Sequence, residues 1–345
     1  MVKSRSRKKL RRLRTRAVYS ITVIFFFCCG LELWNVISGE SKFIDKSILS
    51  SKLPILKSND EASTEALSKE QLESIAAAAK KAKEEAKKLE EEKALKLANE
   101  AKVQASLRLQ AINDKIKKYL GADYSFVSID YLDLTSGDTL KINNKVIWHT
   151  ASTIKVPVVM LIMDMLKAGT LKETDTMYYN ASTDYEVGTG KLQSMNKSKP
   201  FNIMLLCEYS IRYSDDIALN MLLRKVGYNT VTAKLKAKMG MQWGSKPNQA
   251  STEMMTKLLS ILYKAENPYY LKEIEWLKNT DFHDRLDKYI PKALVAHKIG
   301  NYSSCVHDVG IVYAPKPYIL SIYTKGLKNG PEKIAQISKM FYEER

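Results

Sequence analysis

The pattern of hydrophobic and polar positions in this 345-residue chain changes several times, and the first feature is an apolar run from Ala17 to about Ile37. The run is long enough to span a bilayer. Nine of the sixteen residues before it are Lys or Arg, and the stretch Cys29–Glu32 offers no cleavage site of small residues. This pattern favours an uncleaved signal anchor over a cleaved secretory signal. We therefore predict a cytoplasmic basic arm at 1–16, a transmembrane anchor at 17–38 and an extracytoplasmic remainder.

The next segments are polar and then rich in helix-forming residues. Residues 39–63 are polar and contain Pro54, which predicts a spacer. From Thr64 the chain is rich in Ala, Glu, Lys and Leu and lacks Gly and Pro until Gly121, which predicts a long exposed helix. We interpret 64–105 as a stalk. Its apolar positions are only loosely heptad-like, so both a solvated single helix and a homodimeric coiled coil remain open: Leu89, Leu97, Val103, Leu107 and Ile112.

Residues 106–345 show the mixed periodicities of an α+β domain. An apolar helical face at Leu107, Leu109, Ile112 and Ile116 opens it. Strand patterns follow at 126–132 and 139–142 and return at 293–298, 309–313 and 318–324. Between them the period is helical, most clearly at 156–166, 202–212, 217–226 and 252–264, and Gly330-Pro331 begins a closing helix. We predict a five-stranded antiparallel sheet flanked by terminal helices, with an all-helical insertion between its second and third strands.

Composition narrows the chemistry. The net charge of +17 includes the basic arm, which adjoins the apolar run and lacks interleaved aromatic residues, so we predict a membrane flank and no nucleic-acid partner. Cys207 and Cys305 are expected to be two buried thiols, not a disulfide. His283, His297 and His307 lack metal-ligand spacing, and we predict no metal site.

Three short motifs bear residues suited to acyl transfer without a histidine base. Ser152 and Lys155 are one helical turn apart just before an apolar helix, where free backbone N–H groups stabilise an oxyanion. A neutral Lys155 amine could accept the serine proton. The same spacing recurs at Ser194 and Lys197, and helix capping alone would also explain a serine at 152.

The second and third motifs also have structural explanations. In Ser214-Asp215-Asp216, the serine could relay a proton, while either aspartate would cap the helix beginning at Ile217. In Lys298-Ile299-Gly300, a glycine at a strand end would let a substrate backbone approach closely. The order of the three motifs, each in a suitable secondary-structure context, is more specific than any one of them.

Over residues 106–345 the chain resembles the class A β-lactamase and penicillin-binding protein superfamily of active-site serine enzymes. Three segments carry the resemblance: 151–157, 188–193 and 297–313. The resemblance implies that Ser152 is the acylated nucleophile, Lys155 its base, Ser214 a proton relay and Lys298 the cation that binds substrate carboxylate. It also implies substrate contacts at Asp216, Gly300 and Asn301, with the backbone N–H groups of Ser152 and Asn301 forming the oxyanion hole. No cofactor is implied.

The sequence departs from that family at three places. The stretch 243–250 lacks the glutamate that activates the deacylating water, and Glu253 falls in the first turn of the next helix. Asp216 stands where Asn is usual and would favour a protonated Lys155, and Ile299 replaces a hydroxyl residue. We therefore expect inefficient β-lactam turnover, with slow acylation remaining open.

These observations favour a membrane-anchored extracytoplasmic serine hydrolase that acts on β-lactam or peptidoglycan stem-peptide acyl bonds. The alternative is a catalytically degraded domain of the same fold that serves as a wall-binding or scaffolding module. The intact Ser152, Lys155, Ser214 and Lys298 support the first interpretation. Asp216, Ile299 and the missing glutamate support the second.

Overall fold

The computed structural model describes residues 69–344. The chain divides into two compact units, residues 1–83 and 84–345, and the second unit holds the sheet and the helices packed on it. Among the described helices, none is long and apolar enough to cross a membrane. The predicted basic arm, anchor at 17–38 and spacer at 39–63 lie outside the described residues.

A five-stranded antiparallel sheet forms the centre of the second unit, as predicted. Its strands lie in the order β2-β1-β9-β8-β7. Their bounds are β1 (Val127–Asp133), β2 (Thr139–Ile142), β7 (Val295–Tyr302), β8 (Cys305–Val312) and β9 (Tyr318–Lys325). The ladder between β7 and β8 continues to the Tyr302–Cys305 pair, so these strands extend four residues beyond the predicted boundaries at 298 and 309.

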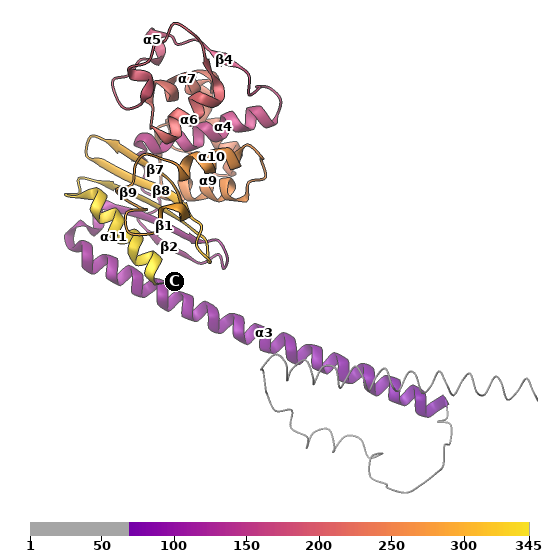
Figure 1. Cartoon of the computed structure of the whole chain (residues 1–345). Coiled ribbons are helices and arrows are strands. Elements are labelled where there is room, and N and C mark those ends of the chain that lie inside the picture. Colours follow the sequence, from indigo (N-terminus) through magenta and orange to yellow (C-terminus); the bar gives the residue numbers. More distant parts are fainter. Residues whose placement is uncertain (1–68, 345) are drawn as a thin grey trace, which may run out of the picture. The chain divides into compact units, whose positions relative to one another are not determined.

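The sheet is buried on both faces because its strands carry apolar residues at successive positions. On β9, Leu320 and Ile322 belong to one buried cluster, while Ile319 and Tyr323 belong to the other. Side chains two apart point to the same face of a strand, so this alternation separates two cores. Terminal helices cover the first face and the helical insertion covers the second (Figure 1).

The terminal helices are α3 (Lys69–Leu120) and α11 (Gly330–Glu343). The end of α3 buries Leu109, Ile112, Ile116 and Leu120, whereas Leu107 is 54% exposed, so its predicted place in the core was wrong. α3 runs without a break through the predicted boundary between stalk and domain at 105, and that boundary stays a prediction. The loosely heptad-spaced residues Leu89, Leu97 and Val103 are exposed.

The insertion between β2 and β7 is mostly helical and contains two small strand pairs that the sequence analysis missed. These pairs are β3 (Trp148–His149) with β6 (Gln249–Ala250), and β4 (Thr176–Met177) with β5 (Phe201–Asn202). The prediction that the insertion contains only helices was therefore wrong in detail. Two-residue strands are too short to produce a periodic pattern.

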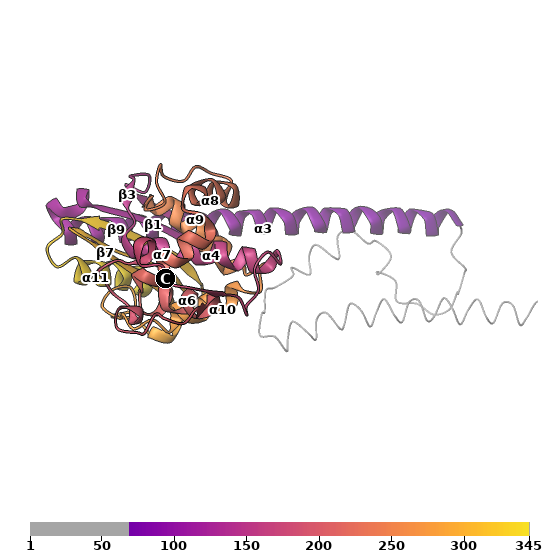
Figure 2. The ribbon, with the colours of Figure 1, turned by 90° about the horizontal axis from the view of Figure 1, so that it is seen from above.

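Seven α-helices and five 3₁₀ turns complete the described part of the chain. The predicted helices at 156–166, 202–212, 217–226 and 252–264 are confirmed to within about one residue at each end. The buried helix α4 contacts α6, α7, α8 and α10, and Figure 2 shows it among the helices of the insertion. The helices are α4 (Lys155–Lys167), α5 (Ala181–Asp184), α6 (Ile203–Arg212), α7 (Asp216–Val226), α8 (Val231–Met239), α9 (Thr252–Lys264) and α10 (Tyr270–Lys278). The 3₁₀ turns are η2 (Gly121–Phe126), η3 (Ala151–Ile154), η4 (Lys191–Gln193), η5 (Tyr228–Thr230) and η6 (Lys292–Leu294).

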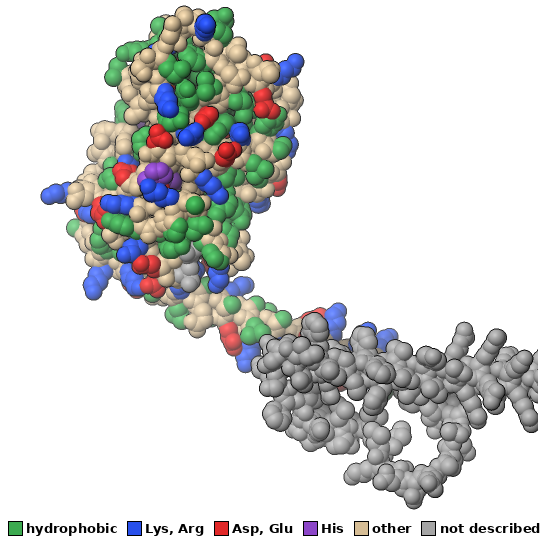
Figure 3. Space-filling view, in the orientation of Figure 1, with side chains coloured by type: hydrophobic (Ala, Val, Ile, Leu, Met, Phe, Trp, Pro, Cys, Tyr) green, Lys and Arg blue, Asp and Glu red, His purple; other side chains and the backbone are tan. Residues whose placement is uncertain are grey.

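The surface of the domain carries charges of both signs. On the face drawn in Figure 3, basic and acidic side chains are interspersed over the described residues. Several of these charges are paired, including Lys288 with Glu332 at 2.6 Å and Lys238 with Asp164 at 2.6 Å. The serine and lysine side chains of the sequence motifs lie at a cavity beside β7, at the edge of the sheet.

Candidate active site

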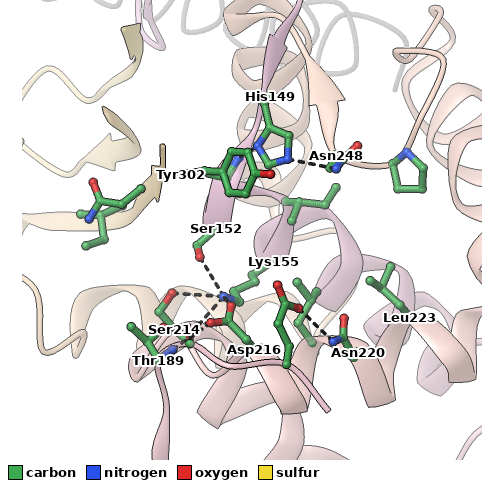
Figure 4. Close-up of a pocket in the computed structure, with 18 of the residues that line it drawn as sticks. His149, Ser152, Lys155, Thr189, Ser214, Asp216, Asn220, Leu223, Asn248 and Tyr302 are labelled. Atoms are coloured by element: carbon green, nitrogen blue, oxygen red, sulfur yellow. Dashed lines mark hydrogen bonds and ion pairs between the residues drawn. The ribbon is translucent and has the colours of Figure 1, made fainter. Parts of the chain in front are cut away.

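Ser152 and Lys155 are held at the start of the buried helix α4. Ser152 lies in the 3₁₀ turn η3, and Lys155 is the first residue of α4. The Lys155 side chain is fully buried, and its Nζ lies 2.8 Å from Ser152 Oγ (Figure 4). The predicted placement of the serine at a helix N-terminus is confirmed, with a 3₁₀ turn before the α-helix.

Ser214 brings the second motif against both lysines. It sits in the turn between α6 and α7 with φ of +51°, an unusual backbone conformation for a residue with a side chain. Its Oγ accepts hydrogen bonds from Lys298 Nζ at 2.9 Å and Lys155 Nζ at 3.2 Å. Two lysine amines occupy the acceptor sites of the hydroxyl, which leaves its own proton available for donation. The three sequence motifs therefore meet at one place.

The two aspartates after Ser214 have different contacts. Asp215 caps α7 by accepting from the Ala218 N–H at 2.9 Å, as the sequence predicted, and it also accepts from the Leu192 N–H at 2.7 Å. Asp216 instead forms an ion pair of 2.6 Å with Lys155 Nζ. Its second carboxylate oxygen accepts from the Thr189 N–H at 2.9 Å. The expected approach of Asp216 to Lys155 is confirmed.

The loop around Thr189 packs against these aspartates with its backbone. A Cβ added to Gly188 would lie 2.0 Å from Asp216 Oδ2, and one added to Gly190 would lie 2.3 Å from the Asp215 carboxyl group. Thr189 Oγ1 also donates to the Ser214 carbonyl at 2.6 Å. Glycine at both positions is thus required for the loop to hold the turn that presents Ser214.

Burial controls the ionisation of both lysines. It lowers the pKa of Lys155 from its usual value, and the adjacent Asp216 carboxylate partly opposes this effect. The pKa of Lys298 falls well below its usual value, first because the side chain is buried and second because Lys155 lies nearby. Both amines are therefore more readily deprotonated than exposed lysines.

Ser152, Lys155 and Ser214 line a cavity of about 580 Å³, whereas Lys298 is fully buried and is not part of its lining. Glu186 and Asp216 are the carboxylates that line it among the described residues. The stretch 243–250 contributes Pro247 and Asn248, and Glu253 is absent from the lining. A buried serine–lysine pair beside a second serine and a second lysine, open to a cavity of this size, can form and break an acyl ester.

A family model described as "Beta-lactamase enzyme family" matches residues 109–344. The chain belongs to the β-lactamase enzyme family. Its members are serine hydrolases, and the match covers every strand and helix around the cavity. The family model begins inside α3, at the first of the buried residues on that helix.

Individual relatives agree with the family and with the fold. The chain is 24% identical to β-lactamase VEB-1 of Pseudomonas aeruginosa over 240 residues, which span 60% of this chain and 79% of that protein. The solved structure of PBP-A matches with a TM-score of 0.62 at 20% identity, over 68% of this chain and 95% of that one. The TLA-1 extended-spectrum β-lactamase matches with a TM-score of 0.63 at 20% identity, over 68% and 98%. These structures establish the β-lactamase-like fold.

Sequence reasoning missed one side of the β-lactamase-family cavity. The His149 ring stacks on Tyr302, with centroids 4.0 Å apart, and its Nε2 lies 3.0 Å from the Asn248 amide (Figure 4). His149 Nδ1 accepts from the Ala151 N–H at 3.1 Å, and burial lowers the pKa of the ring. The neutral form of His149 is therefore favoured near pH 7. No motif marked these residues, because β3 and β6 join only in the folded chain.

One expectation about a site residue, the substrate contact of Gly300, does not fit the structure. Gly300 does not line the cavity; a Cβ there would approach Ala151, the Thr150 carbonyl and Thr153 at 3.1 Å each. The glycine allows β7 to pack on η3, not on a substrate. The second Ser-x-x-Lys sequence does not form a site either, since Ser194 Oγ and Lys197 Nζ bond to backbone carbonyls of their own loop.

The remaining sequence-predicted residues fall into two groups. Ile299 and Asn301 line the cavity, and the Asn301 side-chain oxygen accepts from Arg285 Nη2 at 2.8 Å. The oxyanion role of its backbone N–H stays a prediction.

Cys207 and Cys305 are buried free thiols, as expected.

The sequence analysis did not foresee one group of side chains that could hold a metal ion. Folding brings His283, Asp287 and His297 together, with candidate ligand atoms within 4.8 Å of one another. Residues 283 and 297 are separated in sequence by an irregular segment, so their spacing matched no metal motif.

Proposed function

We propose that this protein is a membrane-anchored extracytoplasmic serine hydrolase that acts through an acyl-enzyme at Ser152 on β-lactam or peptidoglycan stem-peptide acyl bonds. The observation that carries the proposal is the 2.8 Å contact between Ser152 Oγ and the buried Lys155 Nζ. A buried lysine with a lowered pKa is a suitable base for activating a serine. Membership of the β-lactamase family supplies the substrate class.

In acylation, Ser152 Oγ attacks the substrate carbonyl carbon and its proton passes to Lys155. The carbon–nitrogen bond breaks when Ser214 donates its proton to the leaving nitrogen and takes in return the proton held by Lys155, whose Nζ lies 3.2 Å from Ser214 Oγ. Lys298 Nζ, 2.9 Å from Ser214 Oγ, donates a hydrogen bond to that oxygen while the proton moves. The backbone N–H groups of Ser152 and Asn301 would stabilise the oxyanion, and a substrate carboxylate would approach the Lys298 side of the cavity.

Asp216 affects acylation because it changes the protonation state of Lys155. Lys155 can accept the serine proton only in its neutral form, and the 2.6 Å ion pair with Asp216 favours the charged form. Acylation therefore requires that the pair lose a proton, which slows the reaction near neutral pH. This contact is also the observation that favours the alternative function, a wall-binding module in which the site is no longer catalytic.

Deacylation is expected to be the slow step of the reaction. Water must attack the Ser152 ester, and the stretch 243–250 has no carboxylate to activate it. Glu186 lines the cavity, but its Oε2 accepts from Asn220 Nδ2 at 3.0 Å on an exposed loop. A long-lived acyl-enzyme follows from this arrangement. One solved structure of a PBP-A point mutant is an acyl-enzyme complex with penicillin G, a precedent in a protein of the same fold.

Activity can be measured with two substrates. The full-length protein in detergent would be incubated with a penicillin and with a peptide ending in D-Ala-D-Ala. β-Lactam absorbance and free D-alanine would then be followed against the Ser152→Ala variant. Slow product formation from either substrate that is lost in the variant supports the hydrolase. No Ser152-dependent product, together with equal binding of both proteins to peptidoglycan, would favour the wall-binding module.

The cellular location needs its own test. The proposal predicts that the full-length chain sediments with membranes and that protease added to intact spheroplasts removes its catalytic domain. A chain that lacks residues 1–38 should appear in the soluble fraction. Protection of the domain from external protease would contradict the extracytoplasmic orientation.

A further inference from the structure

A cluster of histidine and carboxylate side chains lies behind the catalytic lysine Lys298. His297 precedes Lys298 on β7, and His283 and Asp287 come from the irregular segment between α10 and β7. Asp287 and His297 are each 1% exposed, whereas His283 is 31% exposed. The cluster is thus buried on two sides and open to solvent at His283.

Two atoms in this cluster lack a hydrogen-bond partner although they are buried. They are His297 Nε2 and Asp287 Oδ1. On the other side of the ring, His297 Nδ1 is anchored to Asp308 Oδ2 at 2.9 Å. A histidine whose Nδ1 donates to one carboxylate and whose Nε2 faces a second carboxylate at 3.4 Å has the orientation of a metal ligand.

The spacing of the facing atoms suits a small cation. His297 Nε2 and Asp287 Oδ2 are 3.4 Å apart, longer than the 2.7–2.9 Å of a strong charged hydrogen bond. In a tetrahedral zinc site with bonds of about 2.1 Å, neighbouring ligand atoms are about 3.4 Å apart. His283 Nδ1 hydrogen-bonds to the same Asp287 oxygen, and its exposed ring has room to shift toward a metal position.

We propose that His283, Asp287 and His297 form a Zn²⁺ site, with water as the fourth ligand. Two imidazoles and one carboxylate are a donor set that zinc binds readily. The site is distinct from the cavity that holds Ser152. Its role would be to position the chain, because the metal would tie the segment that carries Phe282, a cavity residue, to the strand that carries Lys298.

A proton on His297 would compete with the proposed Zn²⁺ for the ring nitrogen Nε2. Burial alone would lower the pKa of this histidine, but Asp308 and Asp287 together raise it to about 10. A bound metal must therefore displace this proton, which makes direct measurement of metal binding the decisive test.

The full-length protein, purified in detergent and stripped with a chelator, would be titrated with Zn²⁺ by calorimetry. Co²⁺ would then be added to a second sample, and its visible absorption would report coordination geometry. We expect one Zn²⁺ per chain, tetrahedral Co²⁺ bands and a higher melting temperature with Zn²⁺. The His283→Ala variant should bind at least about 100-fold more weakly, because even outer-shell partners contribute 10–100-fold.

The matched control is His149→Ala, which removes another half-buried histidine far from this cluster in sequence, and it should bind Zn²⁺ like the unchanged protein. Asp287→Asn should weaken binding as His283→Ala does, with circular dichroism confirming that both variants fold. Equal Zn²⁺ binding by the unchanged protein and His283→Ala would place the metal elsewhere, for example at Cys28 and Cys29, and would overturn the proposal. No Zn²⁺ binding at all would also overturn it and leave a protonated His297 as the occupant.

Discussion

At the residue scale, Asp216 is the side chain that distinguishes this site. It lies 2.6 Å from Lys155 Nζ and is held in place by the Thr189 N–H. Sequence reasoning raised this contact as a condition, since a carboxylate at 216 would favour a protonated Lys155 if it approached the amine. It could not foresee that Thr189 would fix the carboxylate, since that contact depends on how a distant loop folds.

The first prediction concerns Asp216→Asn. The substitution removes a charge that raises the pKa of Lys155, so the neutral amine becomes more abundant near pH 7. Acylation by a penicillin should speed up about tenfold for each unit by which that pKa falls. The rise of the acylation rate with pH should also shift to lower pH. A slower rate with an unshifted profile, in a variant that melts normally, would show that Asp216 assists the reaction.

At the element scale, the contact between β7 and η3 determines how the third motif meets the first. The sequence correctly indicated a strand ending near Lys298, but it assigned Gly300 to substrate contact. In the structure this glycine faces Thr150, Ala151 and Thr153. A glycine at a strand end indicates that another group packs closely against the backbone, but the sequence does not show whether that group is a substrate or part of the protein. The two-residue strands β3 and β6 were missed for a related reason, since they exist only as a pair.

The second prediction concerns Gly300. In Gly300→Ala, the new methyl group meets three atoms at 3.1 Å, and in Gly300→Val the larger side chain must push η3 away. We expect Gly300→Val to lose about 1–3 kcal/mol of unfolding free energy. It should also lose most of its acylation rate, with Gly300→Ala intermediate. Denaturant unfolding and penicillin acylation measure both effects. A Gly300→Val variant that is as stable and as active as the unchanged protein would contradict this packing role.

At the scale of the whole molecule, two hydrophobic cores lie on opposite faces of the sheet, and one of them underlies the active-site elements. One core lies between the sheet and the terminal helices, and the other lies between the sheet and the insertion that carries Ser152 and Ser214. Alternating apolar residues made the sheet and its flanking helices predictable. The exposure of Leu107 was not, because it has the same chemistry as its buried neighbours Leu109 and Ile112 and differs only in which side of the helix it occupies.

The third prediction tests the core beneath the sheet. Ile116 on α3 is fully buried, so Ile116→Ala should lower the free energy of unfolding by about 2–5 kcal/mol. The matched control is Leu97→Ala on the same helix, where the side chain is 66% exposed and the change should stay within about 0.5 kcal/mol. Urea denaturation of both variants measures the difference. Equal effects would show that α3 does not contribute to the core as described.

The most direct test of the central claim is the intact mass of the full-length protein after incubation with a penicillin, beside its Ser152→Ala variant. We predict one adduct with the mass of the whole penicillin on the unchanged protein, mapped to the peptide that contains Ser152, and none on the variant. The adduct should persist after free penicillin is removed, because no carboxylate of the 243–250 stretch is available to activate water. An adduct of equal yield on both proteins, or none on either, would contradict Ser152 as the acylated nucleophile.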